Sequence, residues 1–400
     1  MLKRELYLSK IRDFYYTNSL IKIIYGMRRT GKSVILTQII DEIKSNGIKD
    51  SNIIYINFES LNYSHLKTAK DLDTYVKKLT LNNEKYYLFF DEVQNVEQFE
   101  KALNSLRVED RYSIFITGSN SRMTFKELST DLSGRYVSFR INPLSFKEIV
   151  EITNTKENDY EKLLFNIFEF GGLPQRFSFQ NDQSISNYIS DVYDSIVLKD
   201  VVEKIGVKDV TLFNLIFRYL LETEGKEFSA KNIINYLKSE FREIGNDTLY
   251  SYIEALCSTF ILNKVYRYDI EGKSVLKTLN KYYVSDLGIK TLKTNSKEIN
   301  FSICIENVVY NELISKGYEV YIGKTRKGEV DFVATKNKEF KYIQVSYYLA
   351  SEETIEREFG AYNIINDNYD KYVISLDRSN FSRNGIKHIN LFEFLFDDNF

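Results

Sequence analysis

The stretch LIKIIYGMRRTGKSVILTQII, residues 20–40, decides how the N-terminal part of the chain folds. It opens with LIKIIYG, a nearly continuous apolar run that stops at a glycine, as expected for a strand covered on both faces. Its second half carries isoleucines at helical spacing, so we expect a helix that ends near Gly47. Between strand and helix lies GMRRTGKS, residues 26–33, which we call the phosphate-binding loop. This arrangement predicts an α/β domain that binds a nucleotide.

The phosphate-binding loop fits the pattern G-x-x-x-x-G-K-[ST], in which glycines let backbone N–H groups wrap a polyphosphate. Lys32 is expected to reach the β- and γ-phosphate oxygens, and Ser33 is expected to hold Mg²⁺. The alternative is a glycine turn with a structural lysine, which the strand-to-helix context disfavours. The predicted nucleotide contacts are Gly26, Met27, Arg28, Arg29, Thr30, Gly31, Lys32, Ser33 and Val34.

Four further strand-like runs follow the first, separated by segments long enough for crossover helices. They lie at residues 52–60, 86–93, 112–119 and 136–141. Five strands that alternate with helices predict a three-layer parallel α/β domain.

Two acidic residues follow the third run. Asp91 and Glu92 come directly after YYLFF, so they are predicted to lie at the carboxyl edge of the sheet, where parallel sheets bind ligands. Asp91 would orient hydrated Mg²⁺, and Glu92 would polarise the water that attacks the γ-phosphate. A solvated acidic turn is the alternative.

The last two runs also carry polar candidates. Thr117, Ser119 and Asn120 end the fourth run and are placed to reach the γ-phosphate or the attacking water. Arg135 directly precedes the fifth run, and its guanidinium would neutralise transition-state charge on the nucleotide of a neighbouring subunit. A surface salt bridge is the alternative for Arg135.

The motifs GMRRTGKS, FFDEVQ, TGS, LSGR, NPLSF and GGLP occur in this order. Together they resemble a prokaryotic AAA+-like family of P-loop ATPases with an uncharacterised C-terminal domain. The resemblance implies ATP and Mg²⁺ as cofactors, a core sheet of order 5-1-4-3-2, and often a homo-oligomer. It further implies a P-loop NTPase core over residues 1–145 and a helical lid over residues 146–204, in which Pro174 touches the nucleotide.

Residues 205–290 carry three predicted helices and then a predicted hairpin that turns near Gly272, an order that resembles a winged helix. The third predicted helix, GNDTLYSYIEALCSTFIL, has no lysine or arginine, which argues against DNA reading by this helix. Residues 263–281 of the hairpin interleave five lysine and arginine residues with tyrosines, so the hairpin is a candidate for binding nucleic acid. A solvated strand face is the alternative.

Residues 291–400 predict the element order α-β-β-β-α-β, which resembles the PD-(D/E)XK, or restriction-endonuclease-like, α/β fold. In such nucleases a helix glutamate, a strand aspartate and a Glu-x-Lys motif bind Mg²⁺ and activate water. Glu306 and Asp331 match the first two positions.

The third position does not match, because Gln344 and Ser346 stand where glutamate and lysine are expected. A neutral amide is a weak Mg²⁺ ligand, and serine cannot replace a cation. Glu329 lies on the same strand face as Asp331 and would restore a carboxylate but not the lysine. We therefore predict a degenerate nuclease site, disfavoured for cleavage, of Glu306, Glu329, Asp331 and Gln344.

The composition is that of a globular chain, with 43% apolar and 28% charged residues. The net charge of -2 gives no global attraction to nucleic acid or to an anionic membrane. Two cysteines in helical patterns, and no apolar run near the ~20 residues of a membrane span, predict a cytoplasmic protein without a membrane contact.

These patterns leave three hypotheses for the function. The leading one is a Mg²⁺-dependent ATPase that acts as a switch on its C-terminal domains. The alternatives are an ATP-dependent nuclease or nucleic-acid-processing enzyme, and a slow nucleotide sensor that signals through a partner.

Overall fold

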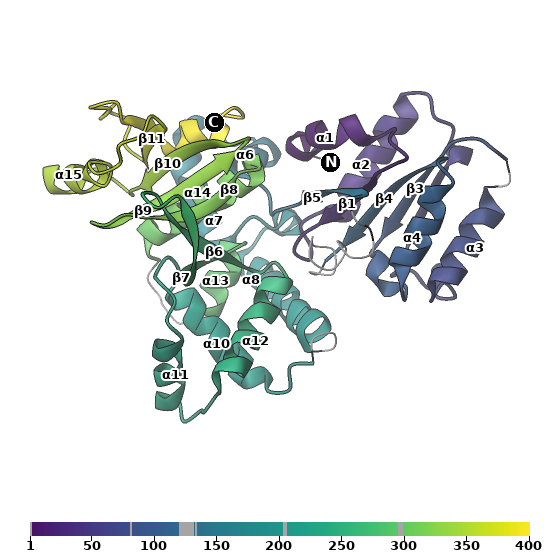
Figure 1. Cartoon of the computed structure of the whole chain (residues 1–400), viewed down its shortest axis with the longest axis horizontal. Coiled ribbons are helices and arrows are strands. Elements are labelled where there is room, and N and C mark those ends of the chain that lie inside the picture. The colour runs from purple at the N-terminus through teal and green to yellow at the C-terminus, as the bar shows by residue number, and fades with distance from the viewer. Residues whose placement is uncertain (1, 81, 120–131, 133, 203–205, 295–298) are drawn as a thin grey trace. The chain divides into compact units, whose positions relative to one another are not determined.

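The computed structural model describes residues 2–80, 82–119, 132, 134–202, 206–294 and 299–400. The chain forms two compact units (Figure 1). Unit 1 comprises Met1–Asn142 and Ser258–Phe260, and unit 2 comprises Pro143–Cys257 and Ile261–Phe400. Each unit has its own sheet, and each is described by itself.

The sheet of unit 1 has five strands in the order β2-β3-β4-β1-β5. All neighbouring strands run parallel. The strands are β1 Ile21–Tyr25, β2 Ile53–Asn57, β3 Tyr86–Asp91, β4 Tyr112–Gly118 and β5 Tyr136–Arg140. The five predicted strands and the predicted order 5-1-4-3-2 are thereby confirmed.

Helices cover both faces of this sheet, which makes the three predicted layers (Figure 1). Because side chains alternate along a strand, Phe89 and Phe115 face one helical layer, while Leu88 and Ile114 face the other. The first layer contains α1 Glu5–Ile11 and α2 Lys32–Ser45, and the second contains α3 Ala69–Leu79 and α4 Phe99–Val108. Apolar burial on both faces explains why these strands read as nearly continuous apolar runs.

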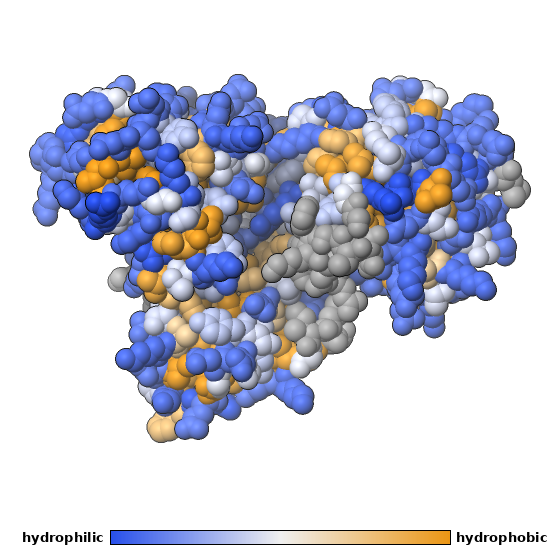
Figure 2. Space-filling view, in the orientation of Figure 1, coloured by the Kyte–Doolittle hydropathy of each residue, from blue (hydrophilic) through white to orange (hydrophobic). Residues whose placement is uncertain are grey.

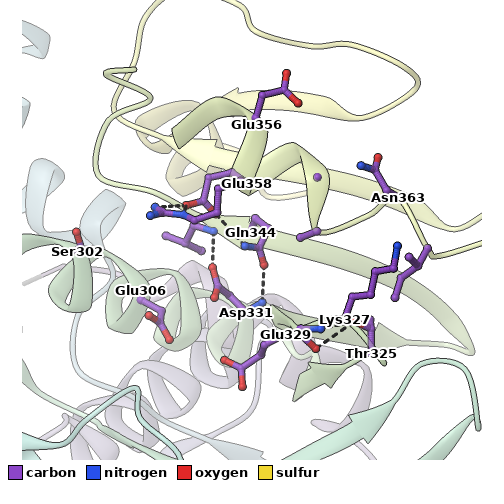
Figure 3. A pocket seen from close by; sticks show the side chains of 16 residues that line it. Ser302, Glu306, Thr325, Lys327, Glu329, Asp331, Gln344, Glu356, Glu358 and Asn363 are labelled. Carbon is purple, nitrogen blue, oxygen red and sulfur yellow. Dashed lines mark hydrogen bonds and ion pairs between the residues drawn. The ribbon is translucent and has the colours of Figure 1, made fainter. Parts of the chain in front are cut away.

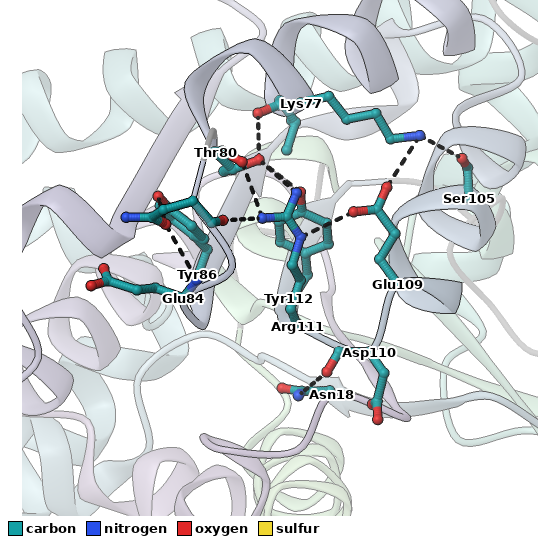
Figure 4. A network of polar contacts seen from close by, with 12 residues as sticks. Asn18, Lys77, Thr80, Glu84, Tyr86, Ser105, Glu109, Asp110, Arg111 and Tyr112 are labelled. Carbon is teal, nitrogen blue, oxygen red and sulfur yellow. Dashed lines mark hydrogen bonds and ion pairs between the residues drawn. The ribbon is translucent and has the colours of Figure 1, made fainter.

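A polar network around Arg111 holds the amino edge of this sheet (Figure 4). The guanidinium donates to the carbonyl oxygen of Thr80 at 3.0 Å, pairs with Glu109 at 3.0 Å and lies over the ring of Tyr112. The hydroxyls of Thr80 and Tyr112 share a hydrogen bond of 2.7 Å. The end of α3 is therefore joined to the start of β4, away from the carboxyl edge that carries the candidate site.

Most of the α-helices that the structure describes lie in unit 2, together with one π-helix. They are α6 Phe146–Thr153, α7 Tyr160–Phe170, α8 Asp182–Ser195, the π-helix η8 Ile196–Val202, α10 Val210–Glu222, α11 Ala230–Ser239, α12 Asn246–Ser258, α13 Leu287–Lys293, α14 Phe301–Lys316, α15 Glu352–Gly360 and α16 Leu391–Phe396. The three helices predicted within residues 205–290 are present as α10, α11 and α12, and Ser229 caps α11 by accepting a hydrogen bond from the Asn232 amide.

The sheet of unit 2 has seven strands in the order β12-β11-β10-β9-β8-β6-β7. The strands are β6 Leu262–Asp269, β7 Ser274–Val284, β8 Glu319–Lys324, β9 Glu329–Lys336, β10 Glu339–Val345, β11 Asp370–Ser375 and β12 Lys387–Asn390. The predicted hairpin is β6–β7, and β6 pairs in parallel with β8. The hairpin is thus an edge of the C-terminal sheet, which runs across the boundary that we placed at residue 290.

The cations of the hairpin differ in exposure. The Arg267 side chain is only 7% exposed and lies 3.4 Å from Glu227. The Lys281 side chain is only 6% exposed and is ion-paired with Glu329. The interpretation of the hairpin as a strip of five available cations is therefore wrong for these two, because the sheet buries them.

The GGLP motif at the end of α7 is packed inside unit 2. The buried carboxylate of Asp286 accepts hydrogen bonds from the amides of Gly172 at 2.7 Å and Gly288 at 3.0 Å. The Nε of Arg176 donates to the carbonyl oxygen of Gly171 at 2.7 Å. Burial raises the pKa of Asp286, and burial lowers the pKa of Arg176 to about 10. We call this arrangement the glycine clasp, and it joins α7 to the start of α13.

The surface in Figure 2 is mostly hydrophilic over both units, with scattered apolar patches. Both cysteines are free thiols. Among the helices that the structure describes, none combines the length and the apolar character needed to span a bilayer.

Candidate nucleotide site and carboxylate cavity

The phosphate-binding loop lies between β1 and α2 and has the backbone that its glycines allow. Gly26 has φ 146°, and a Cβ there would lie 2.2 Å from the carbonyl oxygen of Ile141. Arg29 and Gly31 have φ 64° and 94°, in the left-handed region. Left-handed residues in a tight loop turn successive amides toward one concavity, which suits an anion. The loop therefore fits a polyphosphate.

The side chains of the loop are arranged around its own carbonyl groups. The ammonium of Lys32 is buried and donates to the carbonyl oxygens of Gly26 at 3.2 Å and Met27 at 2.9 Å. Thr30 is fully buried and donates from its hydroxyl to Met27 at 3.0 Å. Ser33 is exposed in the first turn of α2. Lys32 is thus held at the loop, while the Ser33 hydroxyl is open to a ligand.

The outer residues of the loop are less constrained. Arg28 lies 3.7 Å from Glu59, and Val34 is half-buried in α2. Arg4, which sequence reasoning missed, donates from Nη1 to the carbonyl oxygens of Thr30 at 2.8 Å and Asn142 at 3.2 Å. Arg4 is buried and so ties the loop to the end of β5.

Asp91 ends β3 and is fully buried. Its carboxylate accepts hydrogen bonds from the hydroxyls of Thr117, on β4, and of Tyr55, on β2, the latter at 2.9 Å. Strand pairing explains this meeting, because Asn57 pairs with Asp91 and Phe90 pairs with Ile116. Thr117 was expected at this edge of the sheet with the γ-phosphate or the attacking water as its partner, whereas no signal in the sequence pointed to Tyr55.

Glu92 follows with φ 55°, a left-handed conformation that is uncommon for glutamate. Its amide donates to the Thr117 hydroxyl at 2.8 Å. Its carboxylate accepts from Ser119 at 3.2 Å and from Gln94. Thr117 therefore bridges Asp91 and Glu92, and a strained backbone of this kind is common at functional sites.

The other three predicted site residues, Arg135, Asn120 and Pro174, lie apart from these contacts or outside the described residues. Arg135 is exposed and precedes β5, at the amino edge of the sheet. Asn120 lies outside the described residues. Pro174 begins a short 3₁₀-helix, Pro174–Ser178, in unit 2, and its contact with a nucleotide stays a prediction.

In unit 2 the structure brings Glu306, Glu329, Asp331 and Gln344 to one cavity of about 580 Å³ (Figure 3). Glu306 comes from α14, Glu329 and Asp331 come from β9, and Gln344 comes from β10. Lys327, Arg357 and Glu358 also line the cavity. The four residues predicted as a degenerate nuclease site are thus neighbours in space.

The polar groups of this cavity are largely satisfied by the protein. Asp331 accepts from the Val345 amide at 2.8 Å and donates its own amide to Gln344 at 2.7 Å. The amide nitrogen of Gln344 donates to Glu358 at 2.8 Å, so Gln344 links the main-chain amide of Asp331 to the Glu358 carboxylate (Figure 3). Within the described parts of the chain, no three carboxylate, imidazole or thiol groups are placed to share a metal ion. These residues therefore do not fit the Mg²⁺ that the predicted likeness to a nuclease implies.

Comparison with known proteins shows which family the chain belongs to. Residues 18–150 match the family model described as "AAA domain", and residues 161–298 match a domain of unknown function, DUF8612. An uncharacterised protein of Haemophilus influenzae is 37% identical over 378 residues, which are 94% of this chain and 93% of that protein. The chain belongs to the family of this Haemophilus influenzae protein.

The family extends to archaea. The uncharacterised protein MJ1544 of Methanocaldococcus jannaschii is 32% identical over 358 residues, which are 86% of this chain and 78% of that protein. Among solved structures, the Walker-type ATPase PABY2304 of Pyrococcus abyssi matches with a TM-score of 0.51 and 16% identity, over 73% of this chain and 96% of that chain. With the match to the AAA domain model, this likeness supports a P-loop NTPase α/β fold for unit 1 of this chain.

Proposed function

We propose that the chain is an AAA+-like ATPase that binds ATP with Mg²⁺ in the phosphate-binding loop and hydrolyses it. The observation that carries the proposal is that this loop and the Asp91–Glu92 pair lie at the same carboxyl edge of one parallel sheet, with β4 between β1 and β3. Thr117, on that intervening strand, holds both acidic residues. Nucleotides bind at this edge of α/β sheets.

The chemical roles divide among the described residues. The Lys32 ammonium would leave the loop carbonyls and neutralise the terminal phosphates. Ser33 and Asp91 are the proposed holders of Mg²⁺, whose bound charge would be shared with the phosphoryl oxygens. Glu92, oriented by Ser119 and Gln94, would accept a proton from the attacking water.

Two substitutions test this proposal. Lys32→Ala is expected to lose ATP binding in calorimetry, and Lys49→Ala, an exposed lysine of unit 1, is the matched control. Glu92→Gln is expected to bind ATP but to release phosphate about 10²- to 10⁴-fold more slowly, and the exposed Glu97→Gln should not. Wild-type turnover in both Lys32→Ala and Glu92→Gln would exclude this site.

We also propose that Arg135 acts between subunits. Arg135 precedes β5, a strand of five residues, whereas the loop of the same subunit follows the parallel strand β1. At ~3.3 Å per residue the two ends are about 16 Å apart, so Arg135 does not reach the nucleotide of its own subunit. The proposal therefore requires a homo-oligomer.

The remaining expectations are proposals about unit 2. Hydrolysis would drive a conformational change there, with Pro174 of the lid touching the nucleotide. Nucleic acid could bind the hairpin through Lys264, Lys273 and Lys277, and the measurement is an affinity that falls steeply with added salt. We further propose that the protein works in the cytoplasm.

A further inference from the structure

Two side chains of strand β7 contact carboxylates that line the cavity of unit 2, which we call the carboxylate cavity. Lys281 forms an ion pair with Glu329, and the Tyr283 hydroxyl donates to Glu306. Residues two apart on a strand point to the same face, so both donors come from one side of β7. The hairpin therefore supplies a cation and a hydroxyl to carboxylates that belong to β9 and α14.

The side chain of Lys281 is buried. It is 6% exposed, against 31% for Glu329. The ion pair places a positive charge beside Glu329 and so compensates negative charge that burial would otherwise disfavour.

The other polar groups around the Lys281 ammonium are hydrogen-bonded within the protein, so they offer few ligand atoms to a metal ion. Asp331 is engaged by the Val345 amide, and both polar atoms of Gln344 are used within the protein. A hard cation such as Mg²⁺ needs oxygen ligands that converge and are free to bind it. Here Glu329 is paired with Lys281, and Glu306 accepts a hydrogen bond from Tyr283.

We infer that Lys281 is the built-in counter-cation of this cavity and occupies the role that a divalent cation has in the nuclease fold. A lysine is absent at Ser346, but another strand supplies one, and it is paired with Glu329. This inference does not depend on the proposed ATPase function, because all of its residues lie in unit 2.

The test is the binding of Mn²⁺ to the full chain without nucleotide, followed by electron paramagnetic resonance. The wild type is expected to show no site that depends on Asp331. Lys281→Met removes the ammonium and is expected to gain one site, at least about tenfold tighter than any wild-type binding in the cavity. The double variant Lys281→Met/Asp331→Asn is expected to lose that gain.

Matched variants separate charge from packing. Lys277→Met removes an exposed lysine of the same strand and should leave Mn²⁺ binding at the wild-type level. Lys281→Arg keeps the cation and should also gain no site. A gain in either variant would contradict the inference, as would a folded Lys281→Met without any gain.

A second test begins with the wild type, whose expected result needs no variant. Supercoiled plasmid incubated with the wild type and Mg²⁺ or Mn²⁺ is expected to remain uncut. Cleavage by the wild type that disappears in Asp331→Asn would overturn the inference, because the cavity would then be a working metal centre. ATP binding in the same preparation reports on unit 1 separately.

Discussion

The glycine clasp gives a sharp prediction for Gly171→Ala. Gly171 has φ 70° and ψ -162°, a combination that only glycine adopts without strain. A Cβ at this position would lie 1.8 Å from Oδ1 of Asp286 and 2.4 Å from its Cγ. Asp286 cannot simply move aside, because it is buried and accepts the amides of Gly172 and Gly288.

The expected loss has two parts. Backbone strain at this φ and ψ costs about 1–3 kcal/mol. Displacing a buried carboxylate from a hydrogen-bonded amide costs about 1.5–3 kcal/mol. Gly171→Ala should therefore destabilise unit 2 by about 2.5–6 kcal/mol.

The assay must resolve the two units, because a chain with two compact units need not unfold in one step. We would measure hydrogen exchange of peptides from α7 and α13 at increasing urea concentration. The control is Gly385→Ala, which has φ 77° but no atom within 4 Å of the new Cβ. It should cost only about 1–2 kcal/mol. Equal losses in both variants would refute the clasp, and an unchanged stability with altered ATP turnover would show that the motif serves the nucleotide instead.

Three further predictions concern unit 1. Burial, with a contribution from the charge of Lys85, lowers the pKa of Lys22 to about 7, which is below its value in the unfolded chain. The unfolded chain therefore binds more protons than the folded chain above pH 7. The free energy of unfolding should rise from pH 7 to pH 9, and this gain should be lost as the pH falls through 7. The slope is at most about 1.4 kcal/mol per pH unit in denaturant unfolding, and Lys22→Met should abolish it. Tyr55→Phe removes a hydrogen bond to Asp91 and should lower the free energy of unfolding by about 1–2 kcal/mol. Thermal unfolding would show this as a lower melting temperature, and an unchanged melting temperature would mean that the contact does not stabilise the fold. Arg135→Ala should bind ATP normally yet hydrolyse it slowly, and mixing it with Lys32→Ala protomers should restore activity only if the arginine acts between subunits.

The sequence predicted the parts of unit 1 that depend on short-range pattern. Strand–loop–helix order, apolar runs and the acidic pair at a strand end are all local, and parallel strands bring their carboxyl ends to one edge. Thr117 was found for that reason. Arg4 and Tyr55 were not predicted, because neither belongs to a recognisable motif and each contacts its partner only in the tertiary structure.

Unit 2 shows a different limit. The alternation of cations and tyrosines in the hairpin looked like an exposed binding face. That interpretation assumed that the hairpin projects into solvent, whereas β6 pairs with β8 and covers Arg267 and Lys281. Pairing between strands that are far apart in the sequence leaves no local pattern, so the position of Lys281 beside Glu329 could not be predicted.

The packing of α6 on α16 has a consequence for biosynthesis. The ring of Phe146, at the start of unit 2, lies 5.3 Å from that of Phe392, near the end of the chain. A nascent chain cannot complete the packing of unit 2 until α16 has left the ribosome. Until β8 has also emerged, the edge of β6 that pairs with it is unpaired and can pair with other chains. We expect the newly made polypeptide to depend on chaperones during this interval, and premature termination anywhere in the last strands to yield aggregates.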